Sequence, residues 1–177
     1  MTALTPILDP VRDLPGLIDR AAMMLAGAKT AAEVLEARET AGLAYDMAKR
    51  AARLQTAKAA HDDLVAAVHR AQADALEIEA AAKRRLADEY DAAQARGEVA
   101  RLGTNQSDLG VSEGNTRLAT SSDIGLSRKA IHDARLIRDA EAADPGIVRR
   151  TLDDRLENGE EPTRTALRRM VTDAAMR

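Results

Sequence analysis

The chain has 177 residues and a formal net charge of −3; aromatic residues make up 1% of it, and alanine is the commonest of its hydrophobic residues. A wide globular core needs aromatic and large aliphatic volume, so this composition indicates thin, closely packed helical assemblies instead. The absence of cysteine excludes disulfides, thiol catalysis and thiolate metal sites, and the slightly acidic balance gives no overall attraction to nucleic acid.

Two further classes of protein are disfavoured by the apolar pattern. No apolar run approaches the roughly 20 residues that a membrane-spanning helix needs. Residues 1–10 lack the basic start and the apolar core of a signal peptide. We therefore expect a cytoplasmic protein that has no contact with a membrane.

Patterns for catalysis and metal binding are also missing. His61 and His69 lie eight residues apart, whereas two histidines on one helix share a metal ion only at three- or four-residue spacing. His61 is better interpreted as a polar residue that helps to fix helix register. The chain has no phosphate-binding loop and no Gly-x-Ser-x-Gly motif. We expect no enzymatic activity, no metal and no cofactor.

The first hundred residues carry the start and stop signals of one short helix and one very long helix. Pro15 fits the first turn of a helix that ends near Gly27, and Thr30 and Glu33 have the spacing of a capping box. From residue 31 to residue 96 there is no proline and a single glycine. We therefore expect an uninterrupted helix of about 65 residues, on the order of 100 Å long.

The apolar positions of this long helix alternate steps of four and three, which is the repeat of a coiled coil. The stripe consists of Leu43, Met47, Arg50, Leu54, Ala57, His61, Leu64, Val68, Ala71, Ala75, Ile78 and Ala82. The first helix is too short to cover all of it, so a homodimer is the economical partner, although the first helix folded back and a solitary charged helix remain alternatives. The sequence leaves open whether the pairing is parallel or antiparallel.

The remainder of the chain divides at a polar stretch. Residues 101–121 are so rich in Gly, Ser, Thr, Asn and Asp that we expect a flexible linker. Residues 122–177 then carry the caps and stops of a small helical domain: a short helix closing at Ile124, then helices over about 127–143, 146–158 and 164–176. The fold class predicted for the whole chain is all-α, with a long Ala-rich antiparallel or coiled-coil helical segment (1–100), a linker and a small C-terminal helix-turn-helix bundle.

The start of the C-terminal domain fits a helix-turn-helix. This motif needs a glycine turn, an apolar plug, a capped second helix and a buried residue one turn later, and Gly125, Leu126, Ser127 and Ile131 fill those positions in order. The face left outward is basic and suits phosphates and guanine edges. The predicted DNA-binding residues are Ser127, Arg128, Lys129, His132 and Arg135.

Two stretches carry a family resemblance. Residues 124–131 (Ile-Gly-Leu-Ser-Arg-Lys-Ala-Ile) and 145–152 (Pro-Gly-Ile-Val-Arg-Arg-Thr-Leu) resemble the helix-turn-helix region of ParB-like partition and plasmid or phage regulator proteins. The resemblance implies a recognition helix braced by further helices. It covers only the C-terminal third, and the nucleotide-binding domain of that family has no counterpart here. The whole chain also looks like prophage-type proteins of alphaproteobacteria.

Two functions follow as hypotheses. The first is a DNA-binding regulator or accessory protein of a phage or mobile element, which binds double-stranded DNA as a homodimer joined by its coiled coil. The second is a protein-binding scaffold or an inhibitor of a host factor, in which the acidic helical rod presents the binding surface. A glycine turn before a basic helix also occurs in helical domains that pack against proteins, so the motif does not by itself decide between them.

Overall fold

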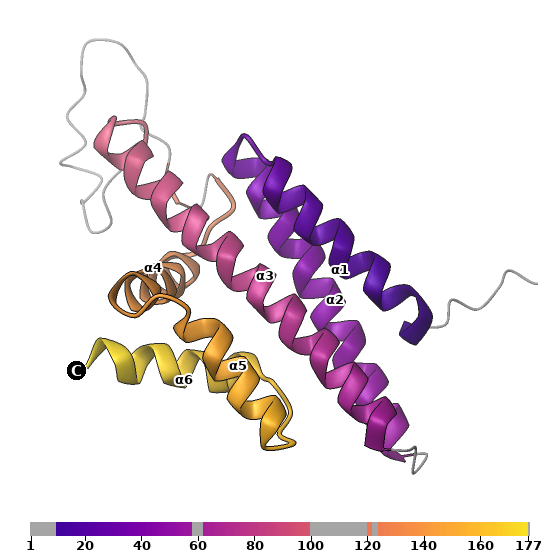
Figure 1. Ribbon diagram of the computed structural model, residues 1–177. Helices are drawn as coiled ribbons and strands as arrows, with labels where there is room; N and C mark the ends of the chain where they lie inside the picture. The colour runs from indigo at the N-terminus through magenta and orange to yellow at the C-terminus, as the bar shows by residue number, and fades with distance from the viewer. Residues whose placement is uncertain (1–9, 58–61, 100–119, 122–123, 177) are drawn as a thin grey trace, which may run out of the picture.

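The computed structural model describes residues 10–57, 62–99, 120–121 and 124–176, and the described part of the chain is all-helical. Three longer helices are followed by three shorter ones (Figure 1). Their bounds are α1 Pro10–Gly27, α2 Ala31–Ala57, α3 Asp62–Ala95, α4 Arg128–Ala143, α5 Ile147–Glu157 and α6 Arg164–Ala175.

The predicted start of α2 is confirmed in atomic detail. The Thr30 hydroxyl accepts a hydrogen bond from the Glu33 amide (3.2 Å), and the Glu33 carboxylate accepts one from the Thr30 amide (3.0 Å). The Lys29 amide donates to the same carboxylate (2.6 Å), and the backbone amides of Lys29 and Thr30 hold the pKa of Glu33 below its usual value. The helix before it starts at Pro10, so Pro15 lies inside α1 rather than in its first turn.

The uninterrupted helix over 31–96 is wrong. α2 ends at Ala57 and α3 begins at Asp62, and the two helices lie side by side, running in opposite directions (Figure 1). Small side chains face each other along the hairpin: Ala51 and Ala52 pack with Val68 at one end, and Val34 packs with Ala82 at the other. Burying apolar surface between two helices of one chain removes it from water without a partner. Val68, Ala75 and Ala82 of the predicted stripe therefore lie inside the molecule.

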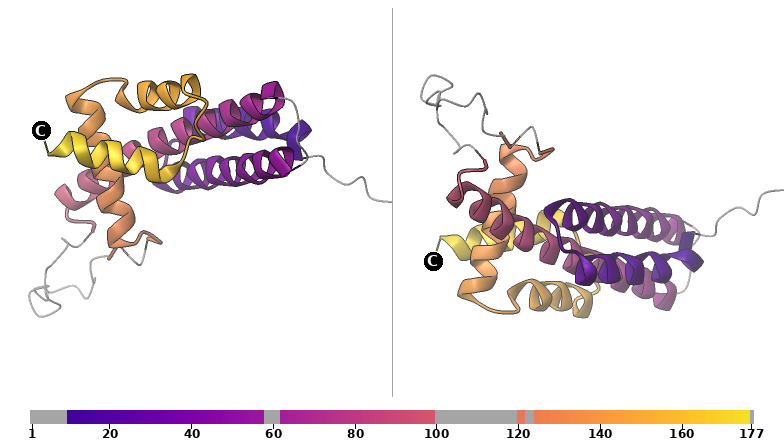
Figure 2. Two further views of the ribbon diagram at one scale, coloured as in Figure 1. Left: turned by 90° about the horizontal axis from the view of Figure 1, so that it is seen from below. Right: turned by 90° about the horizontal axis from the view of Figure 1, so that it is seen from above.

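α3 lies at the centre of the fold. α1 and α2 cover one side of it, and α4, α5 and α6 cover the other (Figure 2). One hydrophobic cluster joins both sides, because Tyr45 of α2 and Leu76 of α3 share it with Ile137, Leu152 and Val171 of the last three helices. The core therefore includes residues from both regions that the sequence analysis separated. Residues 101–119 of the predicted linker lie outside the described residues.

A buried polar residue marks the joint between α3 and the loop before α6. The side chain of Gln72 is fully buried, and its amide donates to the Glu161 carboxylate (3.0 Å), while its own carbonyl oxygen finds no hydrogen-bond partner. Pro162, which follows Glu161 in the chain, is also fully buried. This contact closes the C-terminal helices onto α3, and it is sensitive to charge because the site excludes water.

Candidate nucleic-acid interface

The turn into α4 has the local geometry that the sequence predicts. Gly125 has a φ of +74°, which is the left-handed region that favours glycine, and Leu126 is buried against Tyr90 and Ile131. The Ser127 hydroxyl accepts a hydrogen bond from the Ala130 amide (3.0 Å), so it caps α4. These contacts fix where the helix starts and which face it turns outward.

Most of the short helix expected to close at Ile124 lies outside the described residues. Residues 124 and 125 form a turn, and the helix that precedes α4 among the described residues is α3. α3 ends at Ala95 and α4 begins at Arg128, so these two helices are not joined by the three or four residues of a helix-turn-helix. The predicted plug residue Leu126 packs against Tyr90 of α3. The second helix of the predicted motif and its cap are present, and the motif as a whole stays a prediction.

Three of the predicted contact residues form an exposed basic surface. Arg128, Lys129 and His132 lie on the outward side of the first two turns of α4, beside the exposed Ser127. Arg128 and His132 are four residues apart, so they share one face of the helix. Neither Arg128 nor Lys129 forms an ion pair with a described residue. The free amides and the partial positive charge of the helix start add to the same potential.

Arg135 is bound by an acidic residue of α3 instead of standing free on this surface, and its predicted contact role stays a prediction. Its guanidinium donates to the Asp91 carboxylate (3.0 Å from Nε) and lies 5.5 Å from the ring centre of Tyr90. Arg138 donates to the other oxygen of Asp91 (2.6 Å). Partial burial raises the pKa of Asp91, but hydrogen bonds from Arg135 and Arg138 outweigh it and hold that pKa below its usual value. Arg135 therefore fastens α4 to α3.

Other arginines of the last three helices are occupied by acidic residues in the same way. Arg149 of α5 donates to Glu77 of α3 (2.7 Å) and to Asp153 (3.0 Å). Further ion pairs are Arg150 with Asp144, Arg155 with Glu160, and Arg168 with Asp133. These pairs cancel the positive charge that the sequence places along the C-terminal region. Among the described residues of α4 and α5, the bases without an ion pair therefore lie in the first two turns of α4.

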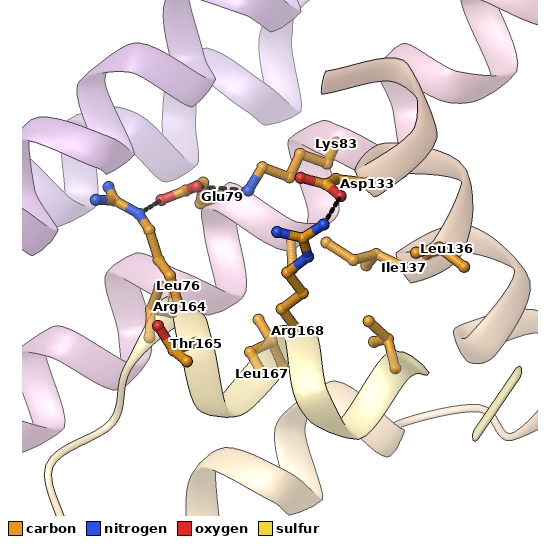
Figure 3. A pocket seen from close by; sticks show the side chains of 12 residues that line it. Leu76, Glu79, Lys83, Asp133, Leu136, Ile137, Arg164, Thr165, Leu167 and Arg168 are labelled. Atoms are coloured by element: carbon orange, nitrogen blue, oxygen red, sulfur yellow. Dashed lines mark hydrogen bonds and ion pairs between the residues drawn. The ribbon is translucent and has the colours of Figure 1, made fainter. Parts of the chain in front are cut away.

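A groove lies beside this surface, between α3, α4 and α6 (Figure 3). It has a volume of about 240 Å³ and an apolar floor that includes Leu76, Ile137 and Leu167. Its edges are ionic: Figure 3 shows Arg168 reaching Asp133 on one side and Glu79 held on the other. Grooves with an apolar floor and a few fixed charges are typical binding sites for small molecules and peptide side chains.

Arg164 links three helices at one end of the groove, and no sequence pattern predicted this role. It donates to Glu79 of α3 (2.9 Å) and to Asp46 of α2 (3.0 Å), and its guanidinium lies 4.2 Å from the ring centre of Tyr45. It also donates to the Gly42 carbonyl (3.3 Å). A cation is disfavoured at the first residue of a helix, and the partners of Arg164 on α2 and α3 offset this cost.

We expect Arg164→Met to lower the free energy of unfolding by about 2–3 kcal/mol, because it leaves the buried carboxylate of Glu79 with only Lys83 as a partner. Urea titration followed by circular dichroism measures the change. Arg169→Met is the matched control, since that side chain is 85% exposed and its acidic partner lies 3.9 Å away. If Arg169→Met lowered the free energy of unfolding as much as Arg164→Met does, the loss would come from a change in the α6 helix itself and not from the ion pairs.

Comparison with protein-family models, with curated proteins and with solved structures gave no match. Among the described residues, no helix is both long and apolar enough to cross a bilayer. The same residues contain no group of three or more His, Asp or Glu side chains placed to hold a metal ion. His61 lies outside the described residues.

Proposed function

We propose that the protein binds double-stranded DNA through the N-terminal turns of α4, as a regulator or accessory protein of a phage or mobile element. The observation that carries the proposal is the exposure of Arg128, Lys129 and His132 at a helix start, where Arg128 and Lys129 have no acidic partner among the described residues. Several arginines of the last three helices form ion pairs, whereas these side chains remain available to contact a polyanion at the start of α4. The resemblance of residues 124–131 to ParB-like regulators supports the same context.

The position of each side chain at the start of α4 determines which part of the DNA it would contact. The Ser127 hydroxyl uses its oxygen to cap α4, which leaves its hydrogen to donate to a phosphate, together with the free amides of the first turn. Arg128 and Lys129 contact phosphates or base edges from the helix surface. Two or three such contacts give weak binding, with a slope of log K against log salt of about −2 to −3.

Fluorescence-anisotropy titration of the full chain with random duplex DNA tests the proposal. We expect salt-sensitive binding that Arg128→Ala combined with Lys129→Ala reduces at least about tenfold, since each lost phosphate contact removes affinity and salt dependence together. The matched control is Arg20→Ala with Arg70→Ala, which removes the same charge from exposed positions on α1 and α3. Equal losses in the two double variants, or no binding at low salt, would refute the α4 surface.

The groove beside α4 favours a second candidate function, which is protein binding. Its apolar floor and ionic edges suit a side chain and a charged neighbour of a partner protein. The rod that the sequence predicts is replaced here by a folded hairpin, so a scaffold or inhibitor would act through the groove between α3, α4 and α6. The same titration separates the two functions, because a protein that binds only through the groove shows no salt-dependent affinity for DNA.

A further inference from the structure

The outward face of α2 carries an apolar stripe whose two ends are exposed, while Met47 between them is half-buried. Leu43 and Leu54 are 55% and 49% exposed, and Met47 and Arg50 lie between them on the same face. The steps of four, three and four residues keep the four side chains in line. α2 lies at an edge of the molecule, with no described helix beyond it (Figure 2).

Folding the chain into a hairpin divides the predicted coiled-coil stripe into two parts. Val68, Ala75 and Ala82 of α3 are buried in the molecule, so they are not available to a partner. The part on α2 stays outside and contains the larger side chains Leu43 and Leu54. A partner of this chain therefore finds its apolar contacts on α2 and not along the whole of residues 31–96.

The charges that border the stripe are arranged to match a second copy of themselves. Asp46 and Arg53 are seven residues apart, so they occupy the same heptad position on one flank of the stripe. When two such helices run antiparallel, Leu43 of one faces Leu54 of the other and Met47 faces Arg50. In that register Asp46 of each copy lies beside Arg53 of the other.

We propose that two copies of the chain associate antiparallel through α2, around a two-fold axis between Met47 and Arg50. The interface is isologous, because every contact occurs twice. It contains two Leu43–Leu54 layers and two Asp46–Arg53 ion pairs. One oxygen of Asp46 already accepts from Arg164 (3.0 Å), which leaves its second oxygen for the other copy. This inference does not rest on DNA binding.

The charges also decide against the parallel arrangement. A parallel pair in register would bring Arg50 against Arg50 in the stripe, and it would place Asp46 and Arg53 of the two copies on opposite sides of the stripe, so that neither ion pair forms. The antiparallel pair instead places Met47 against Arg50 and forms both ion pairs. Because Arg50 lies in the stripe and the apolar area is short, the dimer is weak compared with an obligate one.

Sedimentation equilibrium of the full chain, from micromolar to millimolar concentration, measures the association. We expect a reversible monomer–dimer equilibrium that Leu54→Gln weakens about tenfold and Arg50→Leu strengthens about tenfold, because each change acts on two symmetric contacts. Met23→Gln is the control, since Met23 is also an exposed apolar residue but lies on α1. A chain that stays monomeric throughout, or a control that weakens the dimer as much as Leu54→Gln, would overturn the proposal.

Disulfide trapping reads the orientation directly, because the natural chain has no cysteine. Mixing a Leu43→Cys chain with a Leu54→Cys chain is expected to give a cross-linked heterodimer, while each chain alone cross-links no faster than Met23→Cys, which reports random collisions. All three positions are exposed, so we expect folding to be retained, and circular dichroism checks it. Fast self-cross-linking of the Leu43→Cys chain would instead show a parallel pair and refute the antiparallel one.

Discussion

Gln72→Glu is expected to lower the free energy of unfolding by about 3–5 kcal/mol at neutral pH, which is the cost of an uncompensated charge in the interior. Gln72 is 0% exposed, and its amide is the donor to the Glu161 carboxylate at 3.0 Å. The change keeps the shape of the side chain but replaces that donor by a second carboxylate. Two acidic groups then face each other in a site without water.

Urea titration followed by circular dichroism measures this loss, and its pH dependence tests the cause. Burial beside Glu161 raises the pKa of the introduced carboxyl above its value in the unfolded chain. The penalty is therefore fully present above the raised pKa and disappears as the pH falls below the unfolded value. Gln72→Met is the control and should cost less than about 1 kcal/mol, because it also removes the carbonyl oxygen that has no partner. Equal stability of Gln72→Glu and the natural chain at neutral pH would show that the loop at residue 161 does not cover this position.

Leu152→Ala is expected to lower the free energy of unfolding by about 2–5 kcal/mol, as for other leucines removed from a packed core. Leu152 of α5 is 1% exposed and belongs to the cluster that includes Tyr45 of α2 and Leu76 of α3. Because the cavity opens in a core that both halves of the chain share, all of the helical signal should be lost in one transition at a lower urea concentration.

Leu156→Ala, one turn further along α5 and only half-buried, is the matched control and should cost clearly less. The number of unfolding transitions tests whether the last three helices unfold together with the rest of the chain. If α4, α5 and α6 formed a domain that unfolds on its own, Leu152→Ala would move only the part of the signal that comes from those helices. Two separated transitions would therefore contradict the shared core.

Much of the local structure was readable from the sequence because it depends on neighbouring residues. The capping box at Thr30 and Glu33, the glycine turn at Gly125 and the caps at Ser127 and Thr163 satisfy backbone groups within four residues, so their spacing identifies them. The all-α class follows from the same caps and from the scarcity of proline and aromatic residues. The exposed basic start of α4 was found in this way.

The site beyond the first turns of α4 was not readable in the same way. Arg135 and Arg128 are both basic residues on one predicted helix, yet Arg135 is bound to Asp91, which lies 44 residues earlier in the chain. Arg164 reaches Glu79 and Asp46, and neither is near it in sequence. A pattern within one helix cannot show which of its charges meets a partner from another helix.

The sequence by itself determined that this protein is helical, where several of its helices begin and end, and which side chains line the start of α4. Only the tertiary structure decided that the chain turns back between α2 and α3, that α3 is covered on both sides, and which arginines stay free. The reason is that a heptad pattern with small residues such as Ala71, Ala75 and Ala82 packs equally well against another chain or against its own, and the contacts with the last three helices selected the second.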